Sequence, residues 1–182
     1  MRKFFAISAI GKDRPGIVAG VTKALFDLGT NIEDSSMTIL RGEFAMILII
    51  SSDPRVKTSD FEQSFKELTD KMGLFISVKE IEQDEVHLKK QYSGIPYIIS
   101  VIGTDKPGIV YRIAEVLASK AINITDLNTQ VISGEKTPVY TMIIEVDVPE
   151  YVDIALLEDE FLALEKEMAI DINVRELEVV KL

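Results

Sequence analysis

The first half of the chain alternates between short apolar runs and segments whose apolar residues recur at helical spacing. Residues 4–10 form an apolar run with the length of a buried strand. Pro15 follows, and proline is favoured in the first turn of a helix. Five apolar residues then predict an amphipathic helix that ends near Gly29: Ile17, Val18, Val21, Leu25 and Leu28.

The rest of this half predicts two strands, a helix and a last strand. Residues 31–40 and 44–50 are extended in pattern and are separated by a turn at 41–43, which indicates a hairpin. Ser59 or Asp60 is placed to cap a second helix, whose apolar stripe is Phe61, Phe65, Leu68 and Met72. Residues 74–81 then predict a strand with charged ends, as is typical of a sheet edge. The predicted order is β-α-β-β-α-β.

The second half repeats the first, so each half predicts one small domain. Residues 5–18 match residues 97–110 at a constant offset, and a later stretch, 78–82, matches 174–178 after an insertion around 135–138. The repeat predicts strands at 97–103, 122–132, 139–148 and 170–180 and helices at 107–120 and 152–168. We therefore expect a domain at 1–82, a polar linker at 83–94 and a domain at 95–182.

This element order predicts the fold class α+β, with two ferredoxin-like domains in tandem. Two right-handed crossovers place both helices of a domain on one face of an antiparallel sheet. The other face, or a sheet edge, is then free to meet a neighbour. We expect the two domains to pack together, because the apolar faces of their first helices match.

Composition narrows the functional classes. The 182 residues are 47% hydrophobic, which suits a packed core, and they include no cysteine and one histidine, His87, in a charged stretch. Disulfides, thiolate zinc sites and multi-histidine metal sites are thereby excluded. No segment resembles a signal peptide or a membrane span, so we expect a soluble, cytoplasmic protein without membrane contact. The net charge is −10 and both halves are acidic, which disfavours direct nucleic-acid binding.

One motif, Gly-x-Asp-x-Pro-Gly-Ile-Val, occurs twice, at residues 11–18 and 103–110. It joins the first strand to the first helix of each half. Amides at a helix N-terminus can hold a carboxylate, and the aspartate can hold an ammonium group, so the loop suits an α-amino acid. The alternative is that Asp13 or Asp105 simply caps the helix, with no ligand. The motif lacks the spacing of phosphate and dinucleotide loops.

Other polar residues are less specific indicators of a binding site. Asn31 and Asn123 follow the first helix of each half, where a polar loop residue is ordinary. Asp34 and Asp126 are read as exposed residues at a strand start rather than as a carboxylate pair. No nucleophile with a base, no metal cluster and no cofactor motif is found, so no catalytic or metal-binding residue is predicted and the chain is expected not to be an enzyme.

The doubled motif, the element order and the Asn-Ile pair after the first helix resemble tandem ACT domains over nearly the whole chain. Among ACT proteins the chain is similar to a free-standing two-domain group that includes glycine cleavage system transcriptional repressors. The resemblance implies amino-acid binding at interfaces between ACT domains. The site residues it implies are Asp13, Arg14, Pro15, Gly16, Ile17, Asn31 and Ile32, with Asp105, Lys106, Pro107, Gly108, Ile109, Asn123 and Ile124 in the second half. Ala121 stands where the first half has Gly29, which favours the first site.

Two functions follow as hypotheses. The first is a regulatory homo-oligomer that senses a small amino acid such as glycine or serine and acts through a protein partner, a transcription factor in the control of amino-acid metabolism. The alternative is a structural interaction module built from degenerate ACT domains that bind no metabolite. Polar residues retained in the loop, such as Asp13, favour the first hypothesis.

Overall fold

The computed structural model describes residues 2–83, 94–132 and 138–178. The chain divides into two compact units, Met1–Lys89 and Lys90–Leu182. Most of the predicted linker and most of the predicted insertion lie outside the described residues. Gly94, predicted as the last linker residue, begins a strand.

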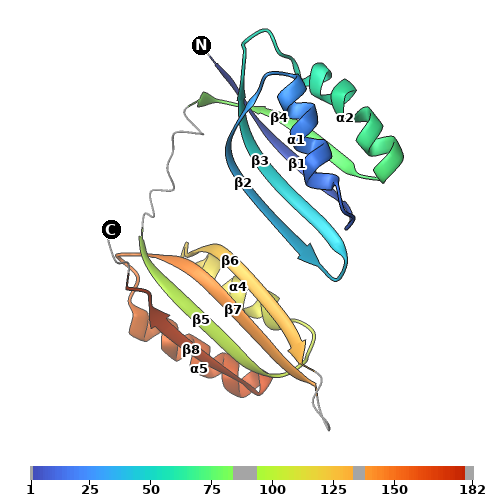
Figure 1. The fold of residues 1–182 in the computed structure, drawn as a ribbon. Helices are drawn as coiled ribbons and strands as arrows, with labels where there is room; N and C mark the ends of the chain where they lie inside the picture. The colour runs from blue at the N-terminus through green and yellow to red at the C-terminus, as the bar shows by residue number, and fades with distance from the viewer. Residues whose placement is uncertain (1, 84–93, 133–137, 179–182) are drawn as a thin grey trace. The chain divides into compact units, whose positions relative to one another are not determined.

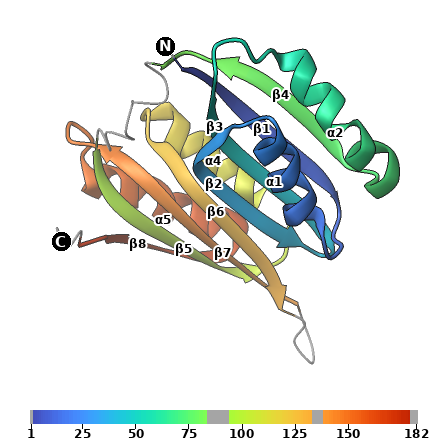
Figure 2. The ribbon, with the colours of Figure 1, turned by 45° about the horizontal axis from the view of Figure 1, so that its top comes forward.

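The first unit has the predicted order of elements (Figure 1). These are β1 Lys3–Lys12, α1 Ile17–Asp27, β2 Asn31–Leu40, β3 Glu43–Ser52, α2 Thr58–Met72 and β4 Phe75–Ile81. All strand pairs are antiparallel, and the sheet has the order β2-β3-β1-β4. Figure 2 shows α1 and α2 side by side on one face of this sheet.

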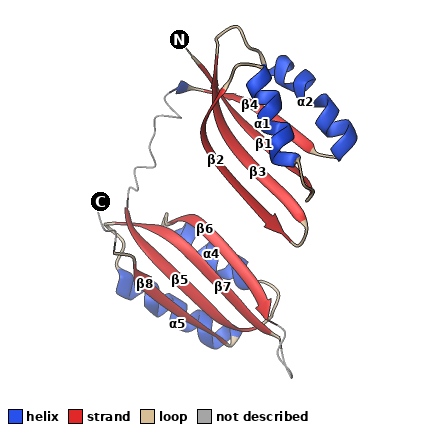
Figure 3. Cartoon of the chain, viewed as in Figure 1, coloured by secondary structure: helices blue, strands red, loops and turns tan. Residues whose placement is uncertain are grey.

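The second unit repeats this architecture (Figure 3). Its elements are β5 Gly94–Thr104, α4 Ile109–Ser119, β6 Asn123–Ile132, β7 Val139–Pro149, α5 Ile154–Met168 and β8 Ile170–Glu176. The sheet order is β6-β7-β5-β8, again antiparallel. The prediction of two ferredoxin-like α+β units is confirmed.

Each unit has its own core between the sheet and the helices. In the first unit, alternate residues of β1 and β3 point to the helices, and Phe5, Ile7, Leu48 and Ile50 are almost fully buried there. Ile17, Val21 and Leu25 of α1 are buried in the same core, as are their counterparts in α4 in the second unit. These residues therefore pack on the sheet of their own unit, and the expectation that they join the two domains is wrong. Packing between the two domains stays a prediction.

Helices α1 and α4 begin two residues later than predicted. Their N-cap residues are Gly16 and Gly108, each with φ 95°, so the preceding prolines lie in a turn rather than in the helix. A positive φ is costly for residues with a Cβ, which explains the glycine after each proline. Lys57 is the N-cap of α2, and Asp60 accepts a hydrogen bond from its amide at 2.8 Å instead of serving as the cap itself.

Glycine at the end of β1 allows a close contact. A Cβ on Gly11 would lie 2.8 Å from Leu74 Cδ2, and one on Gly103 would lie 2.7 Å from Ile170 Cγ2. The first glycine of the motif thus serves the packing of β1 against the start of β4, and its counterpart does the same in the second unit. No helix within the described residues is long and apolar enough to cross a membrane.

Candidate functional site

The loop between β1 and α1 leaves the helix N-terminus open. Residues 12–16 are all exposed, and the Asp13 amide donates to the carbonyl of Gly42 at 2.9 Å. No side chain caps α1, so the alternative that Asp13 caps the helix is wrong. The first intrahelical bond runs from the Gly20 amide to the Gly16 carbonyl, which leaves the amides of residues 17–19 without a helical acceptor.

The equivalent loop of the second unit also lacks a side-chain cap on its helix, but one of its side chains is occupied. Lys106 Nζ donates to the carbonyl of Met168, at the end of α5, at 2.9 Å. Burial and the nearby Asp105 carboxylate raise the pKa of Tyr140. Arg14, which corresponds to Lys106, makes no such bond to any described residue. The loop of the first unit is therefore the more open of the two.

Asn31 and Ile32 lie far from this loop within their own unit. Asn31 pairs with Ser51 across β2 and β3, whereas Asp13 bonds to Gly42, just before β3 begins. About nine residues of β3 separate the two positions, which corresponds to roughly 30 Å. One small ligand cannot contact both Asp13 and Asn31 of the same unit. The register of β6 and β7, in which Asn123 pairs with Asp147, separates Asn123 from Asp105 in the same way.

A polar depression lies at the Asn31 end of the first unit. Its volume is about 550 Å³, and it is lined by Arg2, Gly29, Asn31, Ser51, Ser52, Asp53 and Pro54. Among the described residues, Ser51 and Ser52 are the buried polar side chains, and both line this depression. Buried hydroxyl groups need partners, so their presence at one place indicates a polar environment there.

A hydrogen-bonded cluster joins the three strand ends around this depression. Arg2 Nη1 donates to Ser51 Oγ at 3.2 Å, and Ser51 Oγ donates to Glu33 Oε1 at 2.5 Å. Asn31 Nδ2 donates to the same Glu33 oxygen at 3.1 Å. The pairing of β2 with β3 shifts between Ile32 and Asp34, and this β-bulge contains Glu33. The cluster presents a guanidinium, a carboxylate, an amide and a hydroxyl group within a few ångströms.

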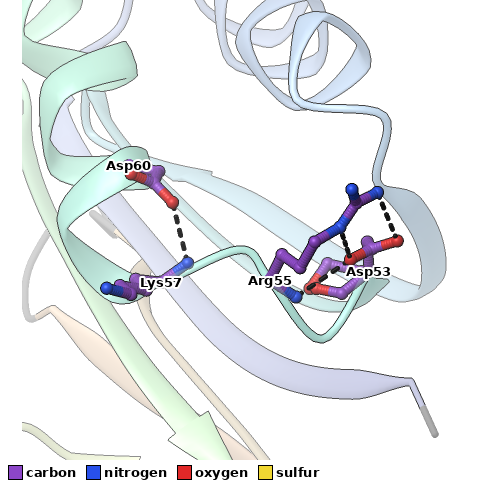
Figure 4. A network of polar contacts seen from close by, with 5 residues as sticks. Asp53, Arg55, Lys57 and Asp60 are labelled. Carbon is purple, nitrogen blue, oxygen red and sulfur yellow. Dashed lines mark hydrogen bonds and ion pairs between the residues drawn. The ribbon is translucent and has the colours of Figure 1, made fainter.

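Asp53 and Pro54, in the loop from β3 to α2, line one side of the depression. Figure 4 shows the polar contacts of this loop. Asp53 accepts from the amide and Nε of Arg55 at 2.9 and 2.8 Å and from its Nη2 at 3.1 Å. These hydrogen bonds to Arg55 lower the pKa of Asp53 to about 2. The carboxylate is consequently ionised at neutral pH, and its charge is balanced by Arg55.

The second unit does not carry the same set of side chains. Asp147 of β7 occupies the position of Ser51, and Val148 occupies the position of Ser52. At the equivalent β-bulge, Thr125 replaces Glu33. Ala121 has a left-handed backbone, with φ 56°, like Gly29 with φ 65°. The first unit is thus the better candidate for a ligand site.

The remaining predicted residues have local roles. Asp34 accepts from the Ser35 amide at 2.8 Å, and Asp126 accepts from Asn128 Nδ2 at 2.6 Å, both at exposed positions. The described residues include no group of three side chains that could hold a metal ion. Sequence reasoning missed Arg2, Glu33 and Ser51, because a β-bulge and the pairing of three strand ends bring them together, and neither leaves a motif.

Comparison with known proteins places the chain among relatives of both one and two domains. It is 27% identical to the glycine cleavage system transcriptional repressor of Escherichia coli over 170 residues, covering 88% of this chain and 83% of that protein. It is 44% identical over 80 residues to a UPF0237 protein of Methanocaldococcus jannaschii, covering 43% of this chain and 84% of that protein.

Solved structures share the fold over nearly the whole chain. An unknown protein from Galdieria sulphuraria is 27% identical with a TM-score of 0.80, and the match covers 97% of this chain and 99% of that one. A putative glycine cleavage system transcriptional repressor is 23% identical with a TM-score of 0.69, and the match covers 98% and 99%. The model of the ACT domain matches residues 3–79 and 96–175. The chain therefore belongs to the ACT-domain family and carries two ACT domains in tandem.

Proposed function

We propose that this chain is a non-catalytic regulatory protein that senses a small amino acid, such as glycine or serine, and acts through a protein partner. The observation that carries the proposal is the open end of α1. Three backbone amides there lack a helical acceptor, and Asp13 is exposed and does not cap the helix. Amides at a helix N-terminus attract a carboxylate, and an aspartate attracts an ammonium group, so together they match an α-amino acid.

The two ends of the first unit would have to come from different molecules to hold one ligand. Asp13, Arg14, Pro15, Gly16 and Ile17 lie at one end, and Asn31 and Ile32 lie at the other. A site that uses both would take the loop from one copy of the chain and the Asn31 end from a second copy. This arrangement supports a homo-oligomer. It also explains how a ligand could be sensed, because ligand binding would favour the assembled state.

The proposed output is transcriptional control of amino-acid metabolism through a partner such as a transcription factor. The name of the Escherichia coli relative supports this, as does the charge of −10, which opposes direct contact with a phosphate backbone. A gel-shift experiment at physiological salt tests whether the isolated chain binds DNA directly. Tight, sequence-specific DNA binding by the isolated chain would contradict the proposed action through a partner.

The test of ligand binding uses a matched pair of variants. We expect one of the twenty amino acids to raise the melting temperature of the wild-type chain, because a ligand that binds only the folded state stabilises it. A charge-assisted hydrogen bond contributes roughly 1.5–3 kcal/mol, so Asp13→Ala should weaken binding about tenfold or more by calorimetry. Asp105→Ala is the control in the second unit and should have a smaller effect.

The outcomes separate the two hypotheses. Unchanged affinity in Asp13→Ala would reject the role given to this aspartate. If none of the amino acids binds the wild-type chain at millimolar concentration, the alternative of a structural interaction module replaces the sensing function.

A further inference from the structure

A groove runs between α5 and β8 in the second unit, which Figure 1 shows side by side. It measures about 260 Å³ and is lined by Glu158, Asp159, Phe161, Leu162, Glu165, Ile172, Asn173 and Val174. The apolar part consists of Phe161, Leu162, Ile172 and Val174, of which Leu162 is 48% exposed. The groove therefore combines an accessible apolar floor with carboxylates along the α5 side.

The carboxylates of α5 that line the groove differ from Glu160 and Glu167 of the same helix, which pair with Lys120 and Arg112. Glu158, Asp159 and Glu165 make no ion pair with any described residue. Arg175, the cation on β8, donates Nε to Asn173 Oδ1 at 3.0 Å instead. Burial raises the pKa of Tyr97, and the charges of Glu176 and Glu158 raise it further. The negative potential thus extends along the groove.

The equivalent groove of the first unit has a different character. Counting along the repeat, Lys66 stands in place of Leu162, Gln63 in place of Asp159 and Thr69 in place of Glu165. The two units share a fold, so these differences do not come from the architecture. Only the second unit has an exposed leucine bordered by unpaired carboxylates at this position.

The edge of β8 constrains what can occupy the groove. The Ile172 amide donates to Glu165 Oε1 at 2.6 Å, so a backbone donor on the edge strand is already occupied. An added β-strand needs such donors free, whereas a helix binds through its side chains. A helix with an apolar face and cationic flanks matches both the floor and the charge of this groove.

We propose that the α5–β8 groove is a docking surface for a positively charged amphipathic helix of a protein partner. Its apolar side chains would contact Leu162, Ile172 and Val174, and its lysine or arginine side chains would lie against Glu158 and Asp159. This inference rests on the proposed function in one respect, since it names where the partner of the regulator binds.

The experiment measures binding of a defined probe to the full chain. The probe is a fluorescent synthetic peptide of about 14 residues, or about 21 Å as a helix, with leucine on one face and lysine elsewhere. A scrambled peptide of the same composition lacks the apolar face. Fluorescence anisotropy at physiological salt should show tighter binding of the amphipathic peptide, and NMR shifts should cluster on α5 and β8.

Matched variants separate specific docking from general attraction to an acidic protein. Glu158→Gln/Asp159→Asn should weaken peptide binding about fivefold, given roughly 0.5 kcal/mol for each exposed ion pair. Glu62→Gln/Asp70→Asn on exposed positions of α2 removes the same net charge and should change the affinity by less than about twofold. Leu162→Lys, which copies the first unit, should weaken binding about tenfold through lost apolar contact and repulsion.

Three results would overturn the docking surface: equal binding of the scrambled peptide, equal losses in the two charge-matched variants, or shifts outside α5 and β8. Amino-acid binding is followed on the same variants by thermal shift. A variant that loses peptide binding but keeps amino-acid binding affects the groove and leaves the sensing function intact. If no amino acid shifts the melting temperature of the wild-type chain, the sensing function is contradicted, and the docking surface is still judged by peptide binding.

Discussion

At the scale of single residues, the two units differ at two left-handed backbone positions. Gly29 and Gly73 of the first unit have positive φ, and the residues at the matching places in the second unit are Ala121, with φ 56°, and Ala169, with φ 53°. Left-handed backbone costs a residue with a Cβ roughly 1–2 kcal/mol, whereas glycine adopts it freely. The second unit therefore carries strain at two helix ends where the first has none.

Exchanging these residues between the units should move their stabilities in opposite directions. A Cβ at Gly29 would meet no heavy atom within 4 Å, so only the backbone cost applies. We expect Gly29→Ala to destabilise the first unit by about 1 kcal/mol and Ala121→Gly to stabilise the second by about the same amount. Urea unfolding followed by circular dichroism reports on both units.

Tyrosine fluorescence separates the two effects. All five tyrosines lie at or beyond residue 92, and there is no tryptophan, so this signal follows the second unit alone. Ala121→Gly should raise the fluorescence midpoint, and Gly29→Ala should leave it unchanged. A raised stability in Gly29→Ala would show that the backbone cost had been misjudged.

At the scale of elements, the periodicity of the sequence was sufficient to predict the order and pairing class of the strands and helices. It misplaced the starts of α1 and α4, because a glycine with φ 95° ends the turn after each proline and a pattern of apolar residues cannot register that. The loop motif was found because it recurs. The cluster of Arg2, Ser51 and Glu33 could not be found, since it depends on strand register and a bulge.

Strand register also explains why Asp13 and Asn31, which were predicted to bind one ligand, cannot do so within one unit. The order of residues along the chain places Asn31 only a short helix after Asp13. The antiparallel pairing places them at opposite ends of the sheet, because α1 and the turns beside it return the chain alongside β1. A sequence motif can thus indicate candidate residues without showing which of them could share a ligand.

The edge of β8 offers a prediction at this scale. The Glu165 carboxylate accepts the hydrogen bond of the Ile172 amide at 2.6 Å, which protects an edge-strand donor. Glu165→Ala should speed hydrogen exchange of the Ile172 amide while leaving the amides of β5 protected. Glu158→Ala, which removes a neighbouring carboxylate on the same helix, is the control and should leave Ile172 unchanged. Equal exchange in both variants would mean that Glu165 does not protect this edge.

At the scale of the whole molecule, duplication has given two units of one fold with different surfaces. The first unit has the open loop, with Arg14 making no bond to a described residue, and the polar depression at Asn31. The second has Lys106 bonded to Met168 and the acidic groove beside α5. Under the two proposals made above, the first unit would bind the ligand and the second the partner, and a coupling between the two sites would let one binding event change the other.

The last prediction tests whether one ligand is shared by two copies of the chain. Asp13 and Asn31 lie at opposite ends of the first unit, so a shared site must draw them from different copies, and each single variant, Asp13→Ala or Asn31→Ala, should lose wild-type affinity. In an equal mixture of the two variants, half of the randomly formed symmetric dimers contain one copy of each, and such a dimer has one intact site of two. Calorimetry on the mixture should therefore recover about a quarter of the wild-type sites, with wild-type affinity.

Mixing Asp13→Ala with the double variant Asp13→Ala/Asn31→Ala should recover none, because no pairing then restores an intact site. If the equal mixture also binds nothing while the wild-type chain binds, the ligand is held within one copy, and Asp13 and Asn31 act at separate places.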